Sequence, residues 1–175
     1  MVAQTTRLYR ELPQSVRHFL VKTALLLSGW LAVYHLLLKP FRFPDKYLTN
    51  IVIDGTVYLL QLLGFDTVSK GQWVYINNEF SVGIADQCNG LELMVLFIGF
   101  LLAIGGTVKS KLLYMLNGVI LIFVLNVVRC TALAYMTHIN APLIDFAHHY
   151  AFKLVIYAVI FMMWYLYSQK EKKYS

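Results

Sequence analysis

The chain has 175 residues, of which 59% are hydrophobic and only 14% are charged. Charged residues make up about 25% of an ordinary soluble domain, so this composition excludes that class and predicts a single integral membrane domain over residues 1–175, in contact with the lipid bilayer. The net charge of +6 comes from basic clusters beside apolar segments. Because such clusters set membrane topology and meet anionic lipid, we expect no nucleic-acid partner.

The N-terminal third of the chain contains one clear membrane span. Residues 1–17 are polar and basic and are predicted to form a cytoplasmic lead-in. Residues 19–38 are mostly apolar and long enough to cross a hydrocarbon core of about 30 Å. Residues 47–64 are interrupted by Asn50, Asp54 and Gln61, and a charge is costly in the bilayer centre. This segment is either a further span or an amphipathic helix at the outer interface, and we favour the interfacial helix.

A change of period between residues 65 and 87 predicts β-structure. Large apolar side chains alternate with other residues there, namely at Trp73, Tyr75, Phe80, Val82 and Ile84. Asn77 and Asn78 lie between the two groups, and asparagine pairs favour the tight turn of a hairpin. We therefore predict a small extracytoplasmic β-hairpin over about residues 72–84.

Three more spans are predicted over about residues 90–108, 112–137 and 149–168. The positive-inside rule assigns the lysine clusters at residues 109–111 and 170–173 to the cytoplasm. The predicted fold is an all-α polytopic membrane bundle of four to five transmembrane helices with the small hairpin. Both counts leave the hairpin and Cys88 on the outer side.

Three of these spans bring chemically reactive or charged residues to one face, namely Cys88, Arg129, His148 and His149. Arg129 lies 18 residues after Lys111, which corresponds to about 27 Å along a helix and therefore to the outer leaflet. An arginine within the membrane is costly unless it meets partners, so Arg129 should point into the bundle. Asn126, three residues earlier, lies on the same helix face and is a candidate supporting residue.

A cysteine, a histidine and an arginine together fit thiol-based acyl transfer. This chemistry needs a thiolate stabilised by a nearby cation, an imidazole that moves a proton, and a cation for the developing oxyanion. Asp145 precedes the two histidines by three and four residues and is a candidate to orient one imidazole. Glu92 lies one turn after Cys88, where it either pairs with Arg129 or His149 or is an interface residue.

Three short motifs carry a resemblance to a known family. Cys88-Asn89-Gly90 resembles a Cys-x-Gly motif at a helix start, and Asn126-Val127-Val128-Arg129 resembles an Asn-x-x-Arg motif. With a histidine opening the final helix, these motifs are similar to those of the exosortase/archaeosortase family of membrane cysteine transpeptidases. The resemblance covers about residues 55–168, and the chain looks like the compact members of the family.

The histidine is the one position with two candidates. The family often has glycine four residues after its histidine, whereas His149 is followed there by Lys153 and His148 by Phe152. We prefer His149, because Phe152 then occupies a position where the family usually has an aromatic residue. His148 remains the second candidate.

The resemblance implies a mechanism, a substrate class and a location. Cys88 would attack a peptide bond in the C-terminal sorting signal of a secreted protein, which carries a short motif, a transmembrane helix and a basic tail. The resulting acyl-thioester would pass to water or to an amine or glycan acceptor, with His149 as acid or base. The resemblance gives Arg129 a proton-donor role, but because the pKa of a guanidinium is above about 12, we expect Arg129 to stabilise thiolate and oxyanion. No metal or organic cofactor is implied. The expected location is the bacterial inner (plasma) membrane, with the active site on its extracytoplasmic side.

Two other functions fit parts of the sequence. Cys88 and Cys130 are the only cysteines, and a membrane thiol-disulfide oxidoreductase would cycle them through a disulfide. The chain has no Cys-x-x-Cys motif, and such proteins usually need two thiol pairs, which counts against this function. The second alternative is a non-catalytic scaffold subunit in which Arg129 and Glu92 hold helices together.

Overall fold

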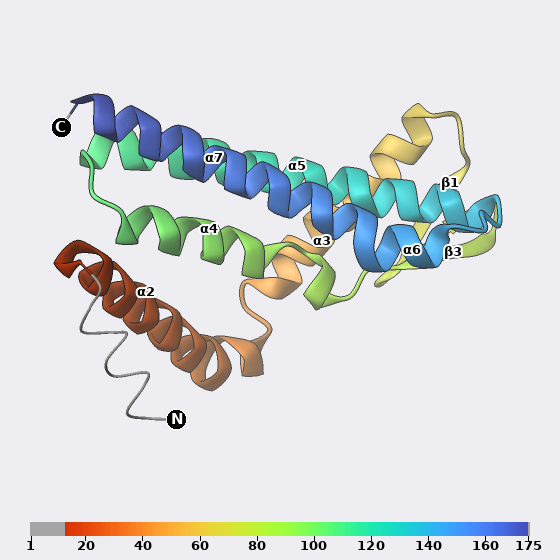
Figure 1. Cartoon of the computed structure of the whole chain (residues 1–175). Coiled ribbons are helices and arrows are strands. Elements are labelled where there is room, and N and C mark those ends of the chain that lie inside the picture. Colours follow the sequence, from red (N-terminus) through yellow and green to blue (C-terminus); the bar gives the residue numbers. More distant parts are fainter. Residues whose placement is uncertain (1–12, 175) are drawn as a thin grey trace, which may run out of the picture.

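The computed structural model describes residues 13–174, and the side chains of all of these except residues 15 and 171–174. The described chain is mostly helical (Figure 1). Its longer helices are α2 (Gln14–Val33), α3 (Asp45–Leu62), α4 (Leu91–Ala103), α5 (Val108–His138) and α7 (Phe152–Tyr174). Its short turns are η1 (Tyr34–Leu38), η2 (Lys39–Phe41), η3 (Asp86–Cys88), α6 (Ile144–Phe146) and η4 (Ala147–Ala151). Most of the predicted lead-in lies outside the described residues.

The structure contains fewer membrane-length helices than the sequence predicts. Within residues 13–174, three helical segments are long and apolar enough to cross a membrane: Val16–Phe41, Val108–His138 and Ile144–Lys170. They contain the predicted spans 19–38, 112–137 and 149–168. The count of four to five spans is not confirmed. The predicted span 90–108 is a helix of 13 residues, and this length of about 20 Å is less than a hydrocarbon core.

The segment predicted over residues 47–64 is the amphipathic helix α3. It is not among the candidate spans within the described chain. Thr49, Val52, Ile53, Thr56 and Leu60 are buried, whereas Asp54 is exposed. The buried face packs against α5 and the sheet.

The predicted hairpin is part of a three-stranded antiparallel sheet. Strands β2 (Trp73–Ile76) and β3 (Glu79–Gly83) pair as predicted. Asn77 and Asn78 both have a positive φ, of 52° and 65°, which is the conformation of a type I′ hairpin turn. The additional strand, β1 (Thr67–Lys70), pairs with β2 at the other edge. Its sequence, Thr-Val-Ser-Lys, lacks the alternation that predicts the other two strands.

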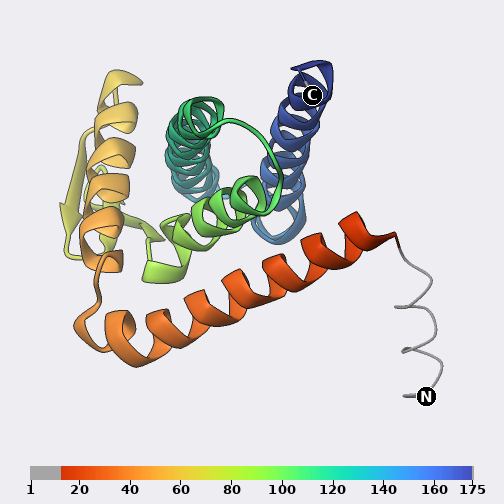
Figure 2. The ribbon, with the colours of Figure 1, turned by 90° about the vertical axis from the view of Figure 1, so that its left-hand side faces the viewer.

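Helix α5 lies between two apolar clusters and is the centre of the molecule (Figure 2). One cluster joins α5 to α3 and the sheet, and it includes Val52, Ile76 and Val127. The other joins α5 to α4 and α7, and it includes Phe97 and Ile122. Helix α2 crosses beneath α4 at the side of this bundle.

One end of the bundle is formed by the α4–α5 connection and the last turns of α7 (Figure 1). The Tyr167 hydroxyl donates a hydrogen bond to the carbonyl oxygen of Gly105 at 3.0 Å. The Lys170 ammonium lies 5.2 Å from the ring centroid of Tyr114. The first turn of α5, which carries Lys109 and Lys111, therefore lies near Lys170 of α7, and the sheet lies toward the other end.

The contact between α4 and α5 predicts a sharp dependence on one glycine. A Cβ atom added at Gly118 would overlap the ring of Phe97, whereas one added at Gly99 would meet no atom within 4 Å. Because overpacking a core costs about 1–3 kcal/mol, Gly118→Ala should lower the unfolding temperature of the detergent-purified chain by several degrees. Gly99→Ala is the matched control and should leave it unchanged. Equal unfolding temperatures for the two variants would contradict this packing.

Candidate functional site

Cys88 lies in a short connection between the sheet and α4, which we call the Cys88 loop (residues 86–90). It starts with the 3-10 turn η3 and ends at Gly90. Gly90 has a φ of 84°, a left-handed conformation that glycine adopts without strain. The backbone N–H of Leu91 donates to the side-chain oxygen of Asn89 at 2.8 Å. This sequence therefore forms a tight entry to α4, with Cys88 one turn before it.

Helix α5 contacts the Cys88 loop directly. Asn126 is fully buried, and its Nδ2 donates a hydrogen bond to the backbone carbonyl oxygen of Cys88 at 2.6 Å. The Cys88 thiol is half-buried, and its side chain packs against the cluster between α3, α5 and the sheet. Arg129, one turn after Asn126, is also half-buried. Its Nε is buried without a hydrogen-bond partner among the described residues.

A cavity of about 290 Å³ lies beside the Cys88 loop, between α4, α5 and α7. Gln87 and Gly90 of the loop line it, as do Asn126 and Arg129. The other lining residues are Glu92, Leu93, Lys153, Ile156 and Tyr157. The cavity therefore has two cationic side chains and one carboxylate on its wall. Cys88 itself does not line it, but the adjacent residue Gln87 does.

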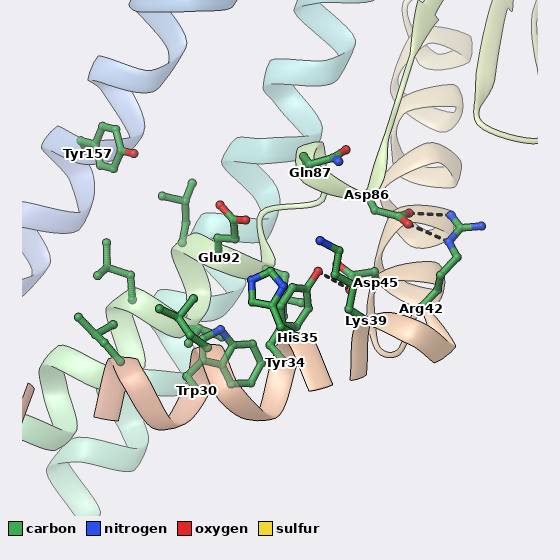
Figure 3. A pocket seen from close by; sticks show the side chains of 16 residues that line it. Trp30, Tyr34, His35, Lys39, Arg42, Asp45, Asp86, Gln87, Glu92 and Tyr157 are labelled. Atoms are coloured by element: carbon green, nitrogen blue, oxygen red, sulfur yellow. Dashed lines mark hydrogen bonds and ion pairs between the residues drawn. The ribbon is translucent and has the colours of Figure 1, made fainter. Parts of the chain in front are cut away.

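A second cavity, of about 610 Å³, adjoins the first one between α2 and α4 (Figure 3). Gln87, Glu92, Leu93 and Tyr157 line both cavities, which therefore lie side by side. The part along α2 and α4 is apolar and is lined by Leu27, Trp30, Leu31, Val95 and Leu96. Polar side chains lie at its other end, namely Tyr34, His35, Lys39, Arg42, Asp45 and Asp86.

The two candidate histidines lie in η4, just before α7, and have different surroundings. His149 is exposed, and its Nδ1 lies 2.9 Å from the backbone carbonyl oxygen of Asp145. The Asp145 carboxylate, considered from the sequence as the orienting group, makes no hydrogen bond to either ring. His148 is half-buried, lies within electrostatic range of Arg129 and Lys153, and meets the His149 ring at 4.9 Å between centroids. Neither imidazole lines the two cavities.

The two remaining sequence candidates, Glu92 and Cys130, have different positions. Glu92 is exposed, lines both cavities and has no ion-pair partner among the described residues. Cys130 is 3% exposed and packs in the same apolar cluster that Cys88 contacts. Both thiols are free.

Sequence reasoning missed several polar residues around the site. Lys153 lines the cavity, but in the sequence it was noted only as a departure from the family pattern. Its position one turn after His149 could have indicated that it lies near the site. Asp86 forms an ion pair with Arg42, with 2.8 Å between Arg42 Nε and Asp86 Oδ2. Hydrogen bonds from Arg42 hold the pKa of the Asp86 carboxyl below its usual value, and Asp86 raises the pKa of Arg42. No local pattern links these two residues, which are 44 positions apart.

The fold and the site define a helical membrane protein with a cysteine-bearing loop beside a cationic cavity. The sequence model of the transmembrane exosortase family matches residues 13–166 of this chain. The chain therefore belongs to the transmembrane exosortase family, and the resemblance stated from its motifs is confirmed. Neither a curated protein nor a solved structure gives a significant match.

Proposed function

We propose that this chain is a membrane cysteine transpeptidase that cleaves the C-terminal sorting signal of secreted, membrane-tethered proteins through an acyl-thioester on Cys88. One observation carries the proposal. Arg129 lines a cavity beside the Cys88 loop, and Asn126 on the same helix holds the Cys88 carbonyl. Family membership supports the same class of enzyme.

In the first step, the sulfur of Cys88 attacks the carbonyl carbon of the scissile peptide bond and forms a tetrahedral oxyanion. Arg129 is suited to stabilise this charge, because its buried Nε–H has no partner among the described residues and its guanidinium stays protonated. The intermediate collapses to an acyl-thioester as the peptide C–N bond breaks. The departing amine needs a proton, and the arginine is a poor source of it.

A histidine supplies that proton after taking it from the thiol. We assign this role to His148 in place of His149, the candidate preferred from the sequence, since His148 is half-buried and within electrostatic range of Arg129. His149 is exposed, and its Nδ1 contacts the Asp145 carbonyl, so only Nε2 would remain for the reaction. In the second step, water or an amine or glycan acceptor attacks the thioester, gives its proton to the imidazole and releases Cys88.

The larger cavity is suited to the part of the substrate that follows the scissile bond. It adjoins the cavity at Arg129, and its wall is apolar along α2 and α4 (Figure 3). The apolar, membrane-length part of α2 is not buried within the structure. The α2 side of the larger cavity is therefore accessible from lipid. A substrate held in the bilayer by its own helix would reach this cavity laterally, with its basic tail toward the lysines of α7.

Variants of the proposed catalytic residues test the mechanism by co-expression with a membrane-tethered candidate substrate. Cys88→Ala should abolish removal of the substrate tail, and Arg129→Ala should slow it by about 10²–10³-fold because an oxyanion donor is lost. His148→Ala should slow it by about 10²-fold or more, and more than His149→Ala. Cys130→Ala is the control and should remain active. The measurement is the ratio of processed to intact substrate on immunoblots.

Tail removal that persists in Cys88→Ala would contradict the proposed mechanism. Equal activity of His148→Ala and wild type, with loss in His149→Ala, would transfer the acid–base role to His149. Unchanged substrate processing in all variants would instead favour the alternative that the chain is a non-catalytic scaffold subunit.

The packing of Cys88 and Cys130 in one apolar cluster favours thiol-disulfide exchange as the second candidate function. Mass analysis of alkylated protein, with and without reductant, distinguishes the transpeptidase from the thiol-disulfide oxidoreductase. The transpeptidase requires a free Cys88 in the active enzyme, whereas an obligatory Cys88–Cys130 disulfide would rule it out.

We also propose that the chain is a multi-pass protein of the bacterial plasma membrane with Cys88 on the extracytoplasmic side. The basic residues at the α4–α5 connection and at the end of α7 support this orientation. A membrane-impermeant maleimide should label Cys88 in intact spheroplasts, whereas a cysteine introduced at Lys109 in a Cys88→Ala chain should react only after lysis. The reverse labelling pattern would contradict the orientation.

A further inference from the structure

We infer that Arg42, Asp45 and Tyr34 are positioning residues for the Cys88 loop, acting through a polar network that fixes the backbone on both sides of the cysteine. This inference rests on the proposed function, because it assigns these residues a role in presenting the Cys88 thiol to the substrate. None of the three belongs to the sequence motifs around Cys88, Arg129 or the histidines.

The first part of the network holds Asp86, two residues before Cys88. Arg42 donates two hydrogen bonds to the Asp86 carboxylate, from Nε to Oδ2 at 2.8 Å and from Nη2 to Oδ1 at 2.9 Å. This two-pronged geometry fixes orientation as well as distance. The Thr49 hydroxyl also donates to Asp86 Oδ1 at 2.9 Å, and the Gln72 amide donates to it at 3.3 Å. Asp86 is therefore tied to α3, to the turn before it, and to the turn between β1 and β2.

Arg42 has a backbone conformation that is unusual for its residue type. Its φ is 50°, in the left-handed region, where a residue with a Cβ is strained and glycine or asparagine is favoured. Arginine at this turn therefore contributes something that glycine would lack. The contact that only a long cationic side chain provides here is the ion pair with Asp86.

The second part of the network holds Asn89, the residue after Cys88. Asn89 is 1% exposed, and its Nδ2 donates to Asp45 Oδ1 at 2.9 Å. Asp45 is 4% exposed, and its Oδ2 accepts a hydrogen bond from the Tyr34 hydroxyl at 2.9 Å. Because a buried carboxylate is costly without donors, this pair of contacts defines one arrangement of the three side chains.

The two parts act together with α5. Arg42, just before α3, and Thr49 of α3 hold Asp86. Asp45 of α3 holds Asn89, and Asn126 holds the carbonyl of Cys88 between them. Three separate hydrogen-bond sets therefore fix the loop, while the Cys88 thiol itself is left half-buried. A nucleophile with a fixed backbone has a defined direction of attack, and a misplacement of about 1 Å can slow a reaction about 10²-fold.

The network also forms a wall of the larger cavity. Tyr34, Arg42, Asp45 and Asp86 line its polar end together with Glu92, and Figure 3 shows the contacts of Tyr34 with Asp45 and of Arg42 with Asp86. The residues that hold the Cys88 loop are thus the residues that a substrate in this cavity would touch. This position distinguishes the network from hydrogen bonds that only stabilise the fold.

The test compares Arg42→Gln, Asp86→Asn, the double variant and Tyr34→Phe in the full-length detergent-purified chain. Tyr58→Phe is the matched control, since Tyr58 is an exposed residue of α3. The probe is N-ethylmaleimide, and mass spectrometry follows modification of the Cys88 peptide over time. Release of the loop should raise the alkylation rate of Cys88 several-fold in Arg42→Gln and Asp86→Asn, and leave it unchanged in Tyr58→Phe.

In the co-expression assay, each network variant should slow tail removal per folded molecule by about 10-fold to 10²-fold. The double variant should lose no more activity than the stronger single variant, because both changes break the same ion pair. Wild-type alkylation and wild-type cleavage in both single variants would overturn the inference, as would additive losses in the double variant. Failure of the proposed function is distinguishable, since it would appear as continued cleavage by Cys88→Ala.

Discussion

The hydrogen bond from Asn126 Nδ2 to the carbonyl oxygen of Cys88, at 2.6 Å, is the contact on which the arrangement of the site depends. It joins the Cys88 loop to α5 at the turn that carries Arg129. Since residues three apart on a helix share a face, this one contact also fixes how Cys88 lies relative to the guanidinium. The buried amide therefore fixes the position of the Cys88 loop relative to the turn of α5 that carries Arg129.

Helix α5 can serve this purpose because it is packed on two sides. The cluster with α3 and the sheet fixes one face, and the cluster with α4 and α7 fixes another. Three buried polar side chains, Asp45, Asn89 and Asn126, lie together around the Cys88 loop at the edge of these clusters. Buried polar groups are costly unless they are satisfied, so the hydrogen bonds of these side chains favour one arrangement of the loop. The apolar packing brings the helices together, and these polar contacts define the geometry between them.

Much of this arrangement could be predicted from sequence, and the limits have physical reasons. The long apolar segments predict the three membrane-length helices, and Asn77-Asn78 predicts the hairpin turn. The predicted span 90–108 is longer than α4, because hydropathy gives little weight to the Gly105-Gly106 pair that follows Ile104, where the helix has already ended. Strand β1 is polar and forms through pairing with β2 rather than through its own pattern.

The polar network around Cys88 was beyond sequence reasoning. Arg42 and Asp86 are 44 residues apart, as are Asp45 and Asn89, so their pairing depends on how α3 packs. Among the site candidates, the sequence indicates that Asn126 and Arg129 share a helix face, and both line one cavity. The two histidines are adjacent in sequence, and only the tertiary structure gives them different surroundings. Spacing in the sequence thus predicts which reactive residues share one helix face. Contacts between residues on different helices can be known only from the tertiary structure.

Trapping the acyl-thioester tests the central claim most directly. Hydroxylamine attacks thioesters, so if Cys88 forms one with the substrate, cleavage in its presence should leave a hydroxamate at the new C-terminus of the substrate. Mass spectrometry of the released protein would detect it, and Cys88→Ala should give neither cleavage nor hydroxamate. Cleavage that yields only a free carboxylate at every hydroxylamine concentration would contradict a covalent intermediate on Cys88.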